Sequence, residues 1–193
     1  MNYSECIENA RTRIGNYCKA CPECNGRACK NQMPGPGAKG IGDTAIRNYD
    51  KWKEIRVQMD TIAENKPVDT SLELFGKKFL YPFFAGPVGA VGLHYGDCLD
   101  DVRYNDILVS ACAKYGIAAF TGDGLDSNVM VAATKAIGKT DGIGIPTVKP
   151  WNIDTVAEKM KMVQESKAFA VAMDVDAAGL PFLKNLNPPA GSK

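Results

Sequence analysis

Four of the seven cysteines stand close together near the N-terminus, where their spacing is suited to metal chemistry. Cys18, Cys21, Cys24 and Cys29 follow the pattern C-x2-C-x2-C-x4-C. Thiolates at this density can converge on one soft metal centre, either four-coordinate zinc or an iron–sulfur cluster. The pattern is close to that of bacterial ferredoxins, but the last spacing is longer and no proline follows. Unligated or redox-active cysteines are the alternative, because spacing alone fixes no geometry.

A second group of chemically capable residues follows a series of short apolar runs. The runs are FLYPFFAG, GIAAFTGDG, GIGIPTV and AFAVAMDVD, and each leads into a polar or glycine-rich loop. Helical patterns near residues 100–115, 127–137 and 153–166 separate the runs. Strands that are buried on both faces and alternate with helices indicate a parallel sheet with right-handed crossovers. We therefore expect the polar residues that follow the strands to share one rim.

Local signals support the starts of these helices and the elements that precede them. Asp126, Ser127 and Asn152 can each accept hydrogen bonds from first-turn N–H groups. The segment LELFGKKF predicts a hairpin that turns at Phe75-Gly76-Lys77 and covers the floor of the sheet. Apolar residues at helical spacing over residues 44–64 predict one amphipathic helix or a broken pair.

The expected fold class is α/β, as the N-terminal half of a (β/α)8 TIM barrel with a Cys-rich N-terminal extension. Residues 1–43 form the extension and a Gly/Pro-rich linker, and residues 44–193 form the partial barrel. A closed barrel needs eight strand–helix units, whereas this chain supplies four before it stops. A half barrel leaves strand edges uncovered, so we expect a fragment, or pairing with a second half-barrel or another copy. A different open α/β sheet is the less favoured alternative.

Composition excludes several classes of partner. Lys and Arg total 23 against 22 Asp and Glu, so no broad basic surface is available for nucleic acid. The N-terminus has no apolar leader, and no apolar run approaches the roughly 20 residues of a membrane helix. The odd, locally clustered cysteines are typical of a reducing compartment. We therefore expect a cytoplasmic protein with a small-molecule substrate.

From about Arg47 to Pro181 the sequence resembles the FMN-dependent α-hydroxy-acid oxidases and dehydrogenases. The resemblance is carried by NYDKWKEI, the hairpin LFGKKFLYP, and the strand exits FAGPVG, FTGDG and AMDVDAAG. It implies FMN as the cofactor and hydride transfer to FMN from a 2-hydroxy acid or related alcohol. An iron–sulfur cluster at the cysteines would then offer an electron path to the flavin, whereas zinc would only stabilise the extension.

The resemblance also implies which residues face the flavin at the first two strand exits. Gly86, Pro87, Val88 and Gly89 match the loop that contacts the edge of the isoalloxazine ring. A tight turn that needs glycine for its own geometry is the alternative. Asp123 follows the second strand, where its carboxylate either accepts the N3–H of the flavin or caps the next helix.

At the third and fourth exits, Thr147 and Asp174 stand where family members commonly carry a glutamine and a threonine against the pyrimidine side of the flavin. Lys149 near N1 and O2 would stabilise charge on reduced flavin. Its alternative is a salt bridge with Asp174 or Asp176.

The departures from the family concern catalysis and the substrate. The loop AAGLPFLKN lacks the arginine that binds the substrate carboxylate in family members, a role that Lys184 does not simply replace. The family's catalytic histidine and phosphate-binding strands have no counterpart, and His94, the only histidine, fits a solvated loop. We therefore assign no catalytic residue and expect this chain to be inactive alone. An FMN barrel isomerase, and a non-catalytic half-barrel or metal-binding interaction module that needs a partner half, are the alternatives.

Overall fold

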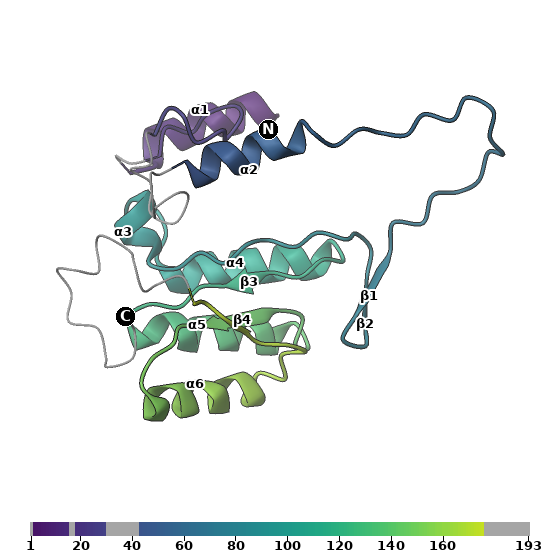
Figure 1. The fold of residues 1–193 in the computed structure, drawn as a ribbon. Helices are drawn as coiled ribbons and strands as arrows, with labels where there is room; N and C mark the ends of the chain where they lie inside the picture. The colour runs from purple at the N-terminus through teal and green to yellow at the C-terminus, as the bar shows by residue number, and fades with distance from the viewer. Residues whose placement is uncertain (1, 16–17, 30–42, 176–193) are drawn as a thin grey trace. The chain divides into compact units, whose positions relative to one another are not determined.

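The computed structural model describes residues 2–15, 18–29 and 43–175, and it divides into two compact units (Figure 1). The first unit is Met1–Asp69 and the second is Thr70–Lys193. The boundary predicted after residue 43 lies within the first compact unit, which extends to Asp69. The difference arises because the helix that begins at Thr44 packs with the cysteine segment.

Two helices, α1 (Tyr3–Arg13) and α2 (Thr44–Trp52), hold the cysteine segment in the first unit. The Tyr3 hydroxyl donates to the Pro22 carbonyl oxygen at 2.5 Å, and the Tyr49 hydroxyl donates to the Glu23 carboxylate. Arg27 forms an ion pair with Asp50 at 3.0 Å. These contacts tie the segment to both helices.

The single helix or broken pair predicted over residues 44–64 is confirmed only as far as Trp52, and no second helix follows before residue 69. The chain leaves helical geometry after Trp52, and Ile55, Met59 and Ile62 are 64%, 83% and 98% exposed. An apolar stripe stabilises a short helix only when it packs against another apolar surface. No such surface covers these side chains among the described residues, so the periodic pattern does not produce a helix here.

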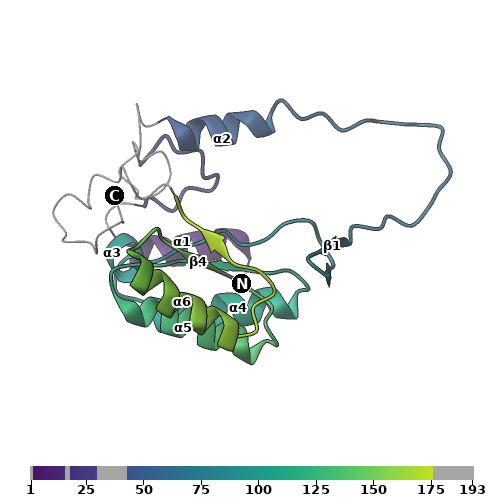
Figure 2. The same cartoon turned by 60° about the horizontal axis from the view of Figure 1, so that its bottom comes forward.

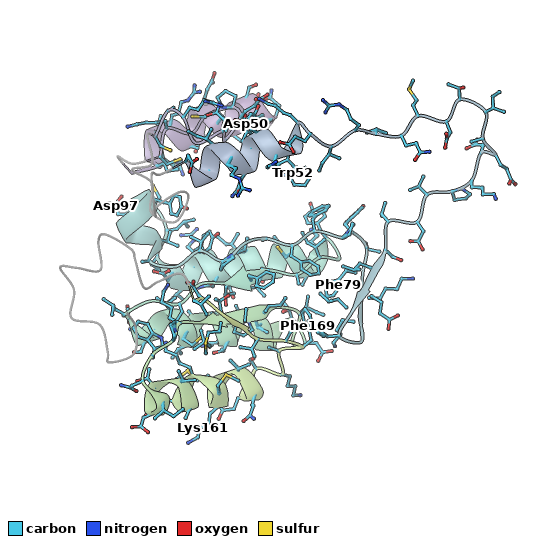
Figure 3. All side chains as sticks on the ribbon, in the orientation of Figure 1. Asp50, Trp52, Phe79, Asp97, Lys161 and Phe169 are labelled. Atoms are coloured by element: carbon cyan, nitrogen blue, oxygen red, sulfur yellow. The ribbon has the colours of Figure 1, made fainter. Side chains whose placement is uncertain are left out.

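The predicted hairpin is confirmed in the second unit. Strands β1 (Leu72–Leu74) and β2 (Lys77–Phe79) pair antiparallel around Phe75 and Gly76, whose φ angles are +49° and +74°. Positive φ angles at both central residues are typical of a type I′ turn, whose twist matches that of the flanking strands in a two-residue hairpin. Phe79 is 2% exposed, and its ring centroid lies 4.8 Å from Phe84 and 5.4 Å from Phe169 (Figure 3). Phe84 directly precedes Ala85, which forms a parallel bridge with Ala119, and Phe169 precedes the parallel strand β5 (Ala172–Met173). The hairpin therefore packs at the amino ends of the sheet.

The parallel sheet runs in chain order, which confirms the α/β prediction. Strands β3 (Phe120–Thr121), β4 (Ile145–Val148) and β5 (Ala172–Met173) pair in that order. Ala85 adds a fourth strand position through a parallel bridge to Ala119. All four predicted strands are therefore adjacent in sequence order.

The helices between the strands begin and end close to their predicted bounds. They are α4 (Asp101–Lys114), α5 (Ser127–Lys139) and α6 (Ile153–Glu165), and a short α3 (Val91–Tyr95) precedes them. Side chains of Asp126 and Asn152 cap α5 and α6 as predicted, and Ser127 is the first residue of α5 rather than its cap. His94 lies within α3 rather than in a loop. No described helix has the length and apolar character needed to span a membrane.

The core lies between the sheet and these helices, with α5 contributing to both of its clusters. Figure 2 shows α5 and α6 side by side along the strands. The first cluster contains Val109, Cys112, Ala119, Ala136 and Ile137, and the second contains Met130, Val148, Trp151 and Val163. Ala119 and Val148 thus face the helices. Because strand side chains alternate, Phe120 and Thr147 face the opposite side of the sheet.

An apolar row runs through β5 and the residues beside it, and it is uncovered in the described part of the chain. Val171, Met173 and Val175 are 42%, 53% and 73% exposed, and Met173 is in register with the helix-facing Val148. The expected pairing with a second half-barrel or another copy remains a prediction.

Truncation of Phe79 tests the contact between hairpin and sheet. We expect Phe79→Ala to lower the free energy of unfolding by about 3–5 kcal/mol, because it removes a buried ring from an aromatic cluster. Phe75→Ala, at a hairpin position that is 71% exposed, should change it by less than about 0.5 kcal/mol. Urea denaturation followed by circular dichroism measures both, and equal effects would contradict the packing role of Phe79.

The thiol of Cys112 offers a pH-dependent test of the core. Burial raises the pKa of this thiol, whereas Cys6 and Cys24 are exposed. At pH 8 we expect iodoacetamide to alkylate Cys112 at least about tenfold more slowly than Cys24, as read by mass spectrometry. The raised pKa means that the folded protein favours the protonated Cys112 thiol. The folded state therefore keeps this stabilisation below the pKa of the unfolded thiol and loses it as pH rises through the folded pKa. If iodoacetamide alkylates Cys112 and Cys24 of the native protein at similar rates, Cys112 does not lie in the core.

Candidate functional site

The carboxylate of Asp123, directly beyond β3, is the most densely hydrogen-bonded side chain at the strand ends. Its Oδ1 accepts from the Gly124 N–H at 2.9 Å and the Lys159 Nζ at 2.7 Å. Its Oδ2 accepts from the Lys149 N–H at 3.0 Å and the Trp151 Nε1 at 2.6 Å. The Asp123 side chain therefore connects the loops that follow β3 and β4 with helix α6.

Asp123 and Lys159 form a buried ion pair. Their side chains are 0% and 8% exposed, and the Lys159 ammonium also lies 5.6 Å from the centre of the Trp151 ring. Burying either charge alone costs several kcal/mol, so each requires the other. The additional N–H donors satisfy the remaining lone pairs of the carboxylate.

Both sequence interpretations of Asp123 need revision. Asp126, not Asp123, caps α5, so the capping alternative is wrong. The Asp123 side chain is fully buried, and each oxygen already accepts two hydrogen bonds within the described chain. Since a ligand would have to displace one of these donors, the geometry gives Asp123 a structural position behind the rim.

Lys149 and Asp174 form a second ion pair at the ends of β4 and β5. The Lys149 Nζ lies 2.7 Å from Oδ2 of Asp174, and the two side chains are 15% and 28% exposed. The salt bridge considered for Lys149 is thus present, while Asp176 lies outside the described residues. Because this pair retains solvent access, it offers the rim a charged group that a ligand can reach.

The glycines of the first strand exit serve two different purposes. A Cβ on Gly89 would lie 2.8 Å from the Asp123 carbonyl oxygen, and one on Gly122 would lie 2.3 Å from the Val88 carbonyl carbon. The two exits therefore touch through their backbones, which explains Gly89 by packing alone. A Cβ on Gly86 would meet nothing within 4 Å. Gly86 and Pro87 are exposed, so this part of the loop leaves space for a flat ligand.

Thr147 adds an unsatisfied polar group on the sheet face opposite the helices. It is 4% exposed, and its hydroxyl has no hydrogen-bond partner among the described residues. A buried hydroxyl without a partner costs about 1–3 kcal/mol, which a polar ligand edge would recover. Together with Lys149 and the open backbone at Gly86, this hydroxyl fits the polar ring of a flavin.

The four clustered cysteines do not converge, so the predicted zinc or iron–sulfur centre is not supported. All four lie in the described chain, in which no group of three or more His, Cys, Asp or Glu side chains is placed to hold a metal. The Cys18 sulfur instead accepts from the Ala20 N–H at 3.5 Å, and the Cys29 thiol donates to the Gly26 carbonyl oxygen at 3.7 Å. The residues between these two cysteines are anchored to α1 and α2 by the contacts of Pro22, Glu23 and Arg27.

Trp151 and Lys159 are site residues that sequence reasoning missed. Lys159 lies between Val156 and Val163 on the inward stripe of α6, and it is 6% exposed. A lysine on an apolar helical stripe signals a buried anionic partner, because lysine is almost never buried unpaired. That signal was available in the sequence, but the identity of its partner was not.

The fold and this rim define a class, the parallel α/β proteins that bind ligands at the carboxyl ends of their strands. Residues 35–183 match the family model described as FMN-dependent dehydrogenase, and the chain belongs to this family. No curated protein sequence matches the chain.

Asp123→Asn tests the buried ion pair. We expect it to lower the free energy of unfolding by about 3–5 kcal/mol, because Lys159 is left buried without a counter-charge. Asp106→Asn is the matched control, since Asp106 pairs with Lys139 at 2.5 Å on the surface and should cost less than about 1 kcal/mol. Urea denaturation of both variants gives the comparison, and a small loss for Asp123→Asn would disprove the buried pair.

Proposed function

We propose that this chain acts in an FMN-dependent oxidoreductase that oxidises a 2-hydroxy acid or a related alcohol. Membership of the FMN-dependent dehydrogenase family supports the cofactor and the redox class. The single observation that supports a flavin at this rim is the partly exposed Lys149–Asp174 pair at the carboxyl ends of β4 and β5. The four parallel strand positions correspond in this proposal to the N-terminal half of a (β/α)8 barrel.

Three features of the rim would hold the cofactor. The Lys149 ammonium would lie against the flavin atoms that gain negative charge on reduction, and Asp174 holds that ammonium in place. The Thr147 hydroxyl would supply a hydrogen bond to the polar edge of the ring. The backbone at Gly86 would contact the edge of the ring, because a Cβ placed at Gly86 would meet no atom within 4 Å.

Bound FMN supplies the two-electron acceptor for the reaction. The substrate loses a hydride from its hydroxyl-bearing carbon and a proton from that hydroxyl, and so becomes the 2-oxo compound. A base of imidazole or carboxylate type must take the proton. We assign that role to no described residue, since the carboxylates at this rim are already committed to lysine partners.

Lys149→Met tests the proposal while preserving the length and the apolar stem of the side chain. We expect the dissociation constant for FMN to rise about tenfold, because the cation nearest the reduced-flavin charge is lost. Titration of the full chain with FMN, followed by quenching of flavin fluorescence, gives the constant. Lys139→Met removes an exposed lysine on α5 that pairs with Asp106, and it should leave the constant unchanged.

Two results would count against this function. If the full chain does not bind FMN, the flavin assignment fails. If it binds FMN but Lys149→Met and Lys139→Met are indistinguishable from the unmodified chain, the Lys149 rim is not the cofactor site.

A further inference from the structure

We propose that Asp123 is a positioning residue that acts on the cofactor through Lys149. This inference rests on the proposed flavin site. Asp123 is buried behind the rim and does not itself reach a ligand, but it holds the backbone of the residue that does. Its contribution to cofactor binding should therefore vanish when the Lys149 ammonium is absent.

Lys149 is held from two sides by carboxylates on different strands. Its backbone N–H donates to Oδ2 of Asp123 at 3.0 Å, and its Nζ donates to Oδ2 of Asp174 at 2.7 Å. One contact comes from the end of β3 and the other from the end of β5, with Lys149 directly after β4 between them. The contact with Asp123 holds the Lys149 backbone, and the contact with Asp174 holds the Lys149 ammonium group.

Asp123 is well placed to hold Lys149 because its own side chain is buried and hydrogen-bonded at both oxygens. Its side chain is 0% exposed, and its backbone lies against the first strand exit, where a Cβ on Gly89 would come within 2.8 Å of the Asp123 carbonyl oxygen. Lys159 and Gly124 hold Oδ1, while Trp151 shares Oδ2 with Lys149. A side chain whose rotamer is locked by packing and hydrogen bonds is the kind of support that a precise site requires.

The contacts of this carboxylate cannot be made by an amide of the same shape. Each oxygen of Asp123 faces two donors, so an asparagine would turn its NH2 group toward either Lys149 and Trp151 or Gly124 and Lys159. In either orientation two hydrogen bonds are replaced by donor–donor contacts. Since the Lys159 charge then favours keeping the remaining oxygen on its own side, we expect Asp123→Asn to release the Lys149 N–H.

A double-mutant cycle between Asp123→Asn and Lys149→Met separates positioning from general support. Trp52→Phe serves as the background for all four proteins, because Trp52 is 75% exposed and its removal leaves Trp151 as the only tryptophan of the chain. The dissociation constant for FMN comes from flavin quenching, and circular dichroism reports that each variant is folded. Trp151 emission reports the change at its contact with Asp123. A second readout is the midpoint potential of the bound flavin, which a purely structural role would not shift.

We expect Asp123→Asn alone to raise the dissociation constant for FMN about tenfold, and less than about twofold in the Lys149→Met background. The midpoint potential should fall in both single variants and fall no further in the double variant, because both act through the same ammonium. Asp126→Asn is the matched control: it replaces the exposed cap of α5 with an equally good capping residue, and both readouts should stay unchanged.

Some outcomes overturn this inference without touching the proposed function. If Asp123→Asn weakens FMN binding equally in both backgrounds, Asp123 acts independently of Lys149. If circular dichroism shows that Asp123→Asn does not fold, the cycle is repeated with the pair Asp123→Leu and Lys159→Met, which removes both buried charges and leaves no side-chain acceptor at position 123 for the Lys149 N–H. If the effects on the dissociation constant for FMN are additive with Lys149→Met in that repeated cycle, the inference is again overturned. Absence of FMN binding in the unmodified chain would instead refute the flavin site itself.

Discussion

The arrangement of the strand ends depends on how one buried carboxylate is neutralised and hydrogen-bonded. Asp123 lies at the end of β3 with no solvent to stabilise its charge, so the fold must bring donors to it. It does so from the next strand exit, through Lys149 and Trp151, and from α6, through Lys159. This carboxylate therefore contacts both α6 and the chain beyond β4, and it adds polar contacts to the apolar packing that holds α6 on the sheet.

Close backbone contact extends this constraint to the first strand exit. Gly89 and Gly122 allow the loop beyond Ala85 to lie directly on the backbone around Asp123, in a space where a Cβ has no room. At the opposite end of the sheet, Phe79 closes the floor with Phe84 and Phe169. One end is thus fixed by apolar packing, and the other by polar contacts that leave a reachable cation.

The two ion pairs differ in solvent exposure, and this difference gives them different roles. The Asp123–Lys159 pair is dry and serves the fold, whereas the Lys149–Asp174 pair keeps access to solvent at the rim. A family that binds FMN needs both a rigid support and a charge near the reactive ring. In the proposed flavin site these two requirements would meet at Lys149, whose backbone N–H donates to Asp123 and whose side chain pairs with Asp174.

The sequence alone determined the elements whose signals are local. Helices α4, α5 and α6, the hairpin turn at Phe75 and the short apolar strands follow from periodicity, capping residues and turn geometry, which depend on near neighbours in the chain. The resemblance to a flavin family rested on similar short runs. Tertiary structure alone decided that α2 ends at Trp52 and that Asp123 pairs with Lys159 across 36 residues. It also decided that the clustered cysteines form no metal-holding group in the described part of the chain. These outcomes depend on which surfaces meet in three dimensions, because apolar stripes, thiols and carboxylates each have several suitable partners in the sequence and only packing selects among them.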